Sequence, residues 1–206
     1  MTAGGVPVRA ARRNAPPREA VLAAAMATIA ERGLDGLTMA GLGREVGMSS
    51  GHLLYYFRSK DELLLQTLEW SEAALGAERR ALLARRGPVA ERLRAYVDLY
   101  VPTQARDPHW TLWLEVWNRS QNAGPEERER QAAIEGAWHR DLVALLAEGI
   151  SRGEFRAVDP DRVATRTRAL LDGFSIQLAV GLPTVDRQAI LDHVREFLTE
   201  SLTPRS

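Results

Sequence analysis

Ser50, His52, Tyr55 and Tyr56 are the side chains whose types and spacing best suit chemistry in this sequence. If they lie on one short helix, its exposed face presents a hydroxyl, an imidazole and two phenols. Such groups hydrogen-bond base edges and phosphate oxygens when a helix enters the major groove of DNA. The chemistry predicted for this face is therefore non-covalent contact with DNA.

Two short helices, at residues 39–46 and 50–57, must position this face. Their close crossing requires a small residue in the first helix and a glycine where the backbone reverses. Gly43 and Gly47 supply both, and apolar contacts flank them at Leu42, Val46, Met48 and Leu53. The spacing predicts a helix-turn-helix, although a helical hairpin that only packs has the same pattern.

Capping residues support both helices. Thr38 can cap the first helix, and Ser49 or Ser50 the second, because their side-chain oxygens accept otherwise unpaired N–H groups. The N-terminus of the second helix, at Ser49, can also meet a phosphate. Gly41 argues against the assignment, because a glycine inside a helix costs about 1 kcal/mol relative to alanine.

The N-terminal end of the chain is basic. Residues 1–60 carry eight basic and four acidic side chains, whereas the 206-residue chain has a net charge of zero. Arg9, Arg12 and Arg13 form a basic arm that either reaches DNA or remains a solvated tail. The imbalance indicates a local site for a polyanion.

Apolar residues recur at intervals of three and four along the chain, which predicts an all-α fold. We expect a flexible basic arm at residues 1–15, a three-helix DNA-binding domain at 16–60 and a larger helical domain at 61–206. Proline, glycine and capping residues divide the chain into about nine helices, at residues 16–33, 39–46, 50–57, 60–86, 89–105, 110–121, 125–152, 160–180 and 186–202.

The stretch from Thr38 to Leu63 closely resembles the DNA-binding region of TetR-family regulators. Its most specific part is Tyr-Tyr-Phe at 55–57 followed by Ser-Lys-Asp-Glu-Leu at 59–63. The resemblance implies a two-fold dimer on a palindromic DNA operator. It also implies that an effector molecule, bound in the C-terminal domain, releases the DNA.

The resemblance further implies a role for each residue of the second helix. Ser50 and His52 match base-reading positions, and Tyr55 and Tyr56 match aromatic positions that contact the DNA backbone or base edges. Leu54 departs from the pattern, because many members of the family have tyrosine there, and this removes one expected DNA contact.

Three flanking positions match the family pattern as well. Thr38 and Lys60 match phosphate-contacting residues, and Phe57 matches a core residue that does not touch DNA. The predicted DNA contacts are therefore Thr38, Ser49, Ser50, His52, Tyr55, Tyr56 and Lys60.

Tryptophans gather in the C-terminal half, where Trp110, Trp113 and Trp117 share one helical face. Their spacing, with Trp138 and the segment 170–178, resembles the BetI-like subgroup. Aromatic rings with nearby carboxylates can hold a cation, which favours an amphipathic or cationic effector; simple core packing accounts equally well for the spacing. The predicted effector pocket comprises Trp110, Trp113, Trp117, Asn118, Trp138, Phe174 and Gln177.

The last two predicted helices have apolar residues on more than one face. A four-helix interface with a second copy of the chain would bury the surplus, as the family resemblance also implies. The alternative is a helix pair buried inside one subunit. The predicted dimer interface comprises Leu170, Phe174, Leu178, Ile190, Val194 and Phe197.

The sequence does not predict an enzyme. It has no cysteine, its four histidines lack a metal-binding spacing, and no serine occupies a nucleophile elbow. We expect no cofactor, no membrane-spanning segment and no signal peptide, and hence a cytoplasmic protein.

The function predicted is that of a dimeric, ligand-responsive repressor. Its expected partners are double-stranded operator DNA, a small-molecule effector of unknown identity and a second copy of the chain. Two alternatives stay open: an activator or ligand-independent regulator of the same family, and a helical enzyme or carrier with a hairpin that only resembles a helix-turn-helix.

Overall fold

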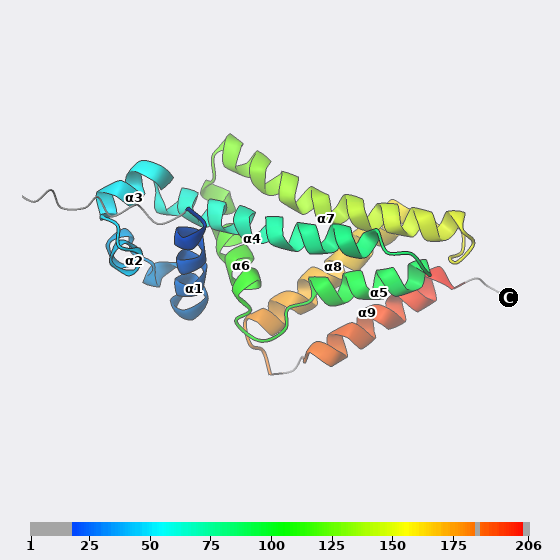
Figure 1. Cartoon of the computed structure of the whole chain (residues 1–206). Coiled ribbons are helices and arrows are strands. Elements are labelled where there is room, and N and C mark those ends of the chain that lie inside the picture. The colour runs from blue at the N-terminus through cyan, green and yellow to red at the C-terminus, as the bar shows by residue number, and fades with distance from the viewer. Residues whose placement is uncertain (1–17, 184–185, 204–206) are drawn as a thin grey trace, which may run out of the picture.

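The computed structural model describes residues 18–183 and 186–203, and the predicted basic arm lies outside these ranges. Within them every regular element is helical (Figure 1). The α-helices are α1 (Arg18–Gly36), α2 (Met39–Val46), α3 (Ser50–Phe57), α4 (Lys60–Leu83), α5 (Val89–Tyr100), α6 (Pro108–Arg119), α7 (Pro125–Ser151), α8 (Pro160–Ala179) and α9 (Arg187–Leu202), and one 3-10 turn, η1 (Ser120–Asn122), follows α6. The all-α prediction is confirmed.

The helix ends follow the capping and proline positions, with one clear difference. The helix predicted at residues 89–105 ends at Tyr100, because Val101 precedes Pro102 and is extended (φ −74°, ψ 132°). A residue before proline disfavours the helical conformation. A loop at 101–107 therefore separates α5 from α6, and it borders a cavity described below.

Helix α1 is broken at Gly33, which was predicted to end it. Gly33 adopts φ 70° and ψ 173°, and one further turn reaches Gly36. The N–H of Leu34 consequently has no carbonyl partner within α1. Glu115 of α6 accepts this N–H at 2.9 Å and so joins the two helices.

Two hydrophobic cores lie along the molecule. The first joins α1–α3 to the start of α4 and to α6, whose Leu112, Trp113 and Val116 complete it. The second joins α5, α7, α8 and α9. Trp117 of α6 packs against both cores, and α4 runs from the α1–α3 end toward the opposite end of the molecule (Figure 1). The domain boundary predicted at residue 60 thus falls between α3 and α4, although α4 and α6 share in the first core.

None of the helices in the described part of the chain is both long enough and apolar enough to cross a membrane.

Candidate functional site

The α2–α3 pair forms a tight helix-turn-helix that depends on two glycines. Gly47 ends α2 in the left-handed conformation (φ 72°), which favours glycine. A Cβ on Gly43 would lie 2.5 Å from the carbonyl oxygen of Met48, so only glycine fits where the turn crosses α2. The predicted roles of both glycines are confirmed.

Thr38 and Ser49 are helix caps, so part of their hydrogen-bonding capacity is already used. The Thr38 hydroxyl oxygen accepts the N–H of Gly41 at 3.0 Å, and that of Ser49 accepts the N–H of His52 at 3.1 Å. Ser49, rather than Ser50, is therefore the cap of α3. Each hydroxyl still has a proton to donate to a phosphate oxygen.

The outer face of α3 is aromatic and exposed. Tyr55 is 80% exposed, Tyr56 52% and Leu54 44%, while Phe57 is buried in the first core. The His52 and Tyr56 rings lie 5.1 Å apart, and Ser50 is exposed beside them. Exposed apolar and aromatic side chains gathered in one patch mark interaction sites, so the face suits contact with another molecule.

Lys60 begins α4 and is half-buried, in contrast to the exposed residues of α3. Ser59 caps α4 by accepting the N–H of Glu62 at 3.0 Å. Glu62 does not return a hydrogen bond to this cap, because its carboxylate bonds Arg130 and Gln66 instead.

A cavity of about 300 Å³ lies between the helices of the C-terminal part. Five aromatic rings line it in a continuous chain, in which neighbouring centroids are 4.9–6.0 Å apart: Trp113, Trp117, Trp110, Tyr100 and Trp138. They come from α5, α6 and α7. Stacked and edge-to-face rings at these spacings form a rigid apolar wall.

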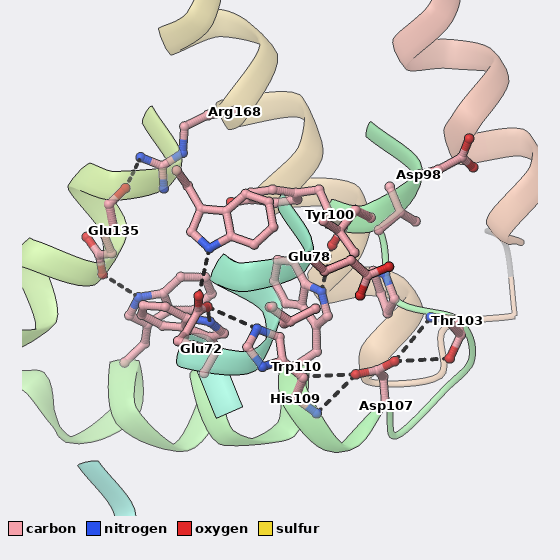
Figure 2. Close-up of a pocket in the computed structure, with 17 residues that line it drawn as sticks. Glu72, Glu78, Asp98, Tyr100, Thr103, Asp107, His109, Trp110, Glu135 and Arg168 are labelled. Atoms are coloured by element: carbon pink, nitrogen blue, oxygen red, sulfur yellow. Dashed lines mark hydrogen bonds and ion pairs between the residues drawn. The ribbon is translucent and has the colours of Figure 1, made fainter. Parts of the chain in front are cut away.

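Glu72 of α4 lies at the centre of this cavity wall (Figure 2). Its carboxylate accepts the indole N–H groups of Trp113 at 2.8 Å and Trp138 at 2.9 Å, and it contacts Nε2 of His109 at 3.0 Å. Burial alone would raise the pKa of Glu72, but the hydrogen bond and charge of His109, with the two indoles, lower it below the usual value. Glu72 is therefore a buried negative charge at neutral pH.

A second group of polar contacts joins α8 to the cavity wall, through Tyr100 and Arg168, which both line the cavity. The Tyr100 hydroxyl donates to Asp172, and Arg168 lies 3.9 Å from the same carboxylate. Burial raises the pKa of Asp172, although its two partners act to lower it. Burial also raises the pKa of Tyr100, and the neighbouring charge of Asp172 raises it further. Glu135 accepts the indole N–H of Trp117 at 2.9 Å and so fixes another ring of the wall.

Acidic groups outnumber basic ones around the cavity. Arg168 and His109 are its basic residues, whereas the acidic ones are Glu72, Glu78, Asp98, Asp107 and Glu135 (Figure 2). Asp107 caps α6 and also accepts from Thr103, which anchors the 101–107 loop at the cavity's edge. Aromatic faces combined with net negative charge favour a small cation over an anion.

The structure separates the residues predicted for the effector pocket. Trp110, Trp113, Trp117 and Trp138 do line the cavity. The other three lie elsewhere: exposed Asn118 faces solvent, Phe174 stacks on His193, and Gln177 bonds its own helix at Gly173.

Sequence reasoning overlooked five of the residues that give the cavity its polarity, Glu72, Tyr100, His109, Glu135 and Arg168. Glu72 had a detectable signature, because it interrupts the apolar stripe of α4 between Leu68 and Leu75. Buried indoles also need acceptors, and four clustered tryptophans therefore require carboxylates or carbonyls nearby.

The residues predicted for the dimer interface divide into two groups. Ile190 and Val194 have no exposed surface and belong to the second core, so in this structure they are interior residues. That part of the prediction is corrected. The spacing of apolar residues does not distinguish a side chain buried inside one subunit from a side chain buried between two subunits. The other four residues predicted for the interface, Leu170, Phe174, Leu178 and Phe197, keep partial exposure on α8 and α9.

Taken together, a helix-turn-helix with an exposed aromatic face and a helical domain with a ligand-sized cavity define a DNA-binding regulator. Residues 21–67 match the family described as bacterial regulatory proteins, tetR family. Residues 89–203 match the family described as BetI-type transcriptional repressor, C-terminal. The chain therefore belongs to the TetR family of transcriptional regulators, with a BetI-type C-terminal domain, and is not an enzyme.

Individual relatives agree with this assignment. An HTH-type transcriptional regulator BetI from Burkholderia mallei is 30% identical over 191 residues, which cover 91% of this chain and 94% of the relative. The BetI regulator of Burkholderia cenocepacia is 29% identical over 188 residues, 88% of this chain and 91% of the relative.

Solved structures agree in fold. A transcriptional regulator from Saccharomonospora viridis in complex with choline is 28% identical, with a TM-score of 0.84 over 91% of this chain and 98% of that one. A TetR-family regulator from Rhodococcus sp. is 22% identical, with a TM-score of 0.72 over 90% and 98% of the two chains.

Proposed function

We propose that this chain is a dimeric repressor that binds a palindromic operator through α3 and is released by a small quaternary ammonium compound such as choline. The observation that carries the proposal is the chain of five aromatic side chains that lines the cavity, two of which, Trp113 and Trp138, donate to the buried carboxylate of Glu72. Aromatic faces hold quaternary ammonium groups by cation–π attraction. The choline complex of the S. viridis regulator supports the same ligand class.

Dimerisation through α8 and α9 is part of this proposal. Leu170, Phe174, Leu178 and Phe197 keep exposed apolar surface on these two helices, and a second copy would cover it. A two-fold dimer places two α3 helices for half-sites about 34–36 Å apart on the DNA, or multiples of that spacing.

The ligand assignment is tested by comparing choline with 3,3-dimethyl-1-butanol, which replaces the ammonium nitrogen by carbon and is neutral. We expect isothermal titration calorimetry to give at least about tenfold tighter binding for choline, because the cation–π and carboxylate attractions act on the charge alone. Trp117→Leu should remove most of this difference, whereas Trp117→Phe, which keeps a ring, should retain much of it. Equal affinity for the two compounds would exclude a cation site.

Effector release requires a link from the cavity to the DNA-binding helices, and α6 provides one. Trp113 and Trp117 of α6 line the cavity, and Glu115 of the same helix holds the N–H of Leu34 beyond the break in α1. At its end, Arg119 pairs with Asp61 of α4 at 3.2 Å. A ligand that shifts α6 would therefore shift the orientation of α1 and the start of α4.

Glu115→Ala is expected to keep choline affinity within about twofold of wild type. It should reduce the factor by which choline weakens operator binding; in allosteric proteins such factors are typically about 5–150-fold. The reason is that only the α6–α1 hydrogen bond is lost. Glu115→Gln keeps an acceptor oxygen and serves as the matched control. Fluorescence anisotropy of operator DNA with and without choline measures the factor, and an unchanged factor in the alanine variant would exclude this route.

A further inference from the structure

A second cavity, of about 360 Å³, lies between α5 and α9. Its volume falls in the range of about 300–1,000 Å³ typical of small-molecule sites. It differs from the aromatic cavity in composition, because no tryptophan or tyrosine lines it. Its interior is aliphatic apart from one phenylalanine, and is formed by Leu93, Val97, Phe155, Leu191, Leu198 and Leu202.

The rim of this second cavity carries two exposed arginines, Arg94 on α5 and Arg195 on α9. Arg195 contacts Asp192 of its own helix, and both of these side chains are more than half exposed. An exposed pair of this kind contributes little energy and exchanges readily for another anion. Both arginines are therefore able to turn toward an anionic group at the mouth of the cavity.

The acidic residues of the same cavity are already engaged. Asp98 pairs with Arg187 at 3.4 Å, which ties the end of α5 to the start of α9. Glu154 accepts the N–H of Val89 and pairs with Arg152 at 3.1 Å. Their charges are thus compensated within the chain, as is the charge of Arg195 by Asp192, so Arg94 supplies the positive charge at the mouth and Arg195 adds to it on exchanging Asp192 for a ligand.

From this arrangement we propose that the α5–α9 cavity binds an aliphatic monocarboxylate. The alkyl chain would lie among the leucines, and the carboxylate would accept hydrogen bonds from Arg94 and Arg195, whose guanidinium groups match its geometry. The site takes a ligand of opposite charge to the one proposed for the aromatic cavity. Asp98 borders both cavities, so α5 forms a wall shared by the two sites.

Octanoate is the probe for this site, and 1-octanol is the matched neutral compound with the same chain. We expect calorimetry on the full-length protein to detect octanoate binding, and the double variant Arg94→Gln/Arg195→Gln to weaken it at least about tenfold. The control variant Arg80→Gln/Arg85→Gln removes two other exposed arginines, one on α4 and one just after it, and should leave octanoate binding unchanged. Octanol should bind the wild type and the rim variant, Arg94→Gln/Arg195→Gln, with equal affinity.

A nitroxide-labelled fatty acid locates the bound chain independently of the substitutions. It should broaden the methyl NMR signals of Leu93 and Leu198 more than those of Leu75, which lines the aromatic cavity. Three results would overturn the proposal: no octanoate binding, equal affinity in the rim variant, or stronger broadening at Leu75. Choline affinity is measured on the same samples, so failure of this site is distinguishable from failure of the proposed effector.

Discussion

Gly43→Val is expected to abolish specific operator binding and leave the aromatic cavity intact. Even the first carbon of the new side chain would lie 2.5 Å from the Met48 carbonyl oxygen, so α2 and α3 must separate. Overpacking of this kind costs about 1–3 kcal/mol of stability. The displaced α3 would retain only non-specific DNA binding, which is about 10³-fold weaker or more. Fluorescence anisotropy with operator and with scrambled duplex measures the loss.

The control for Gly43 is Gly51→Ala, because a Cβ on Gly51 meets no atom within 4 Å. Alanine is favoured over glycine inside a helix by about 1 kcal/mol, so this variant should unfold at or above the wild-type temperature. Choline affinity should remain within about twofold of wild type in both variants. Wild-type operator affinity in Gly43→Val would contradict the close helix crossing on which the DNA-binding surface depends.

Glu72→Gln should damage the aromatic cavity in two ways at once. It removes the buried negative charge, and its amide nitrogen faces an N–H donor that the carboxylate had accepted. An unsatisfied buried donor costs about 1–3 kcal/mol. We therefore expect lower stability in chemical unfolding and at least about tenfold weaker choline binding. Glu129→Gln is the matched control, because Glu129 is exposed on α7, lines neither cavity and should change neither quantity much.

The stability lost in Glu72→Gln should depend on pH with a defined sign. The pKa of Glu72 is lowered in the folded protein from its ordinary value of 4.5. Its ionised form therefore stabilises the fold above about pH 4.5, and this contribution is lost as the pH falls through the lowered pKa. The difference in unfolding free energy between wild type and Glu72→Gln should narrow over that acidic range. A difference that does not change with pH would contradict an ionised Glu72.

Local features of the fold were predictable because they depend on neighbouring residues. Gly43 and Gly47 four residues apart, Ser49 before α3 and the proline that opens α6 act within a few residues of the chain. The helix predicted at residues 89–105 departs from this pattern, because Val101 is extended before Pro102 and α5 ends at Tyr100.

The polar part of the candidate site was not predictable in this way, because it is assembled from separate helices. Glu72 receives its donors from residues 41 and 66 positions away. Phe174 and Gln177 sit on a helix that borders the cavity, but their side chains point elsewhere. Which face of a helix meets a cavity follows from tertiary packing, which residue type and spacing do not specify.

The most direct test of the whole account measures fluorescence anisotropy of the purified protein on duplex DNA, from its own upstream region or from genome-wide operator selection. Wild type and Tyr55→Ala are compared across a salt series, with choline or 3,3-dimethyl-1-butanol added. The account predicts tight binding that weakens with salt and in Tyr55→Ala, and release by choline but not by the neutral compound. Failure to bind any selected duplex would contradict DNA recognition by α3, and binding unaffected by choline would contradict release by a cation.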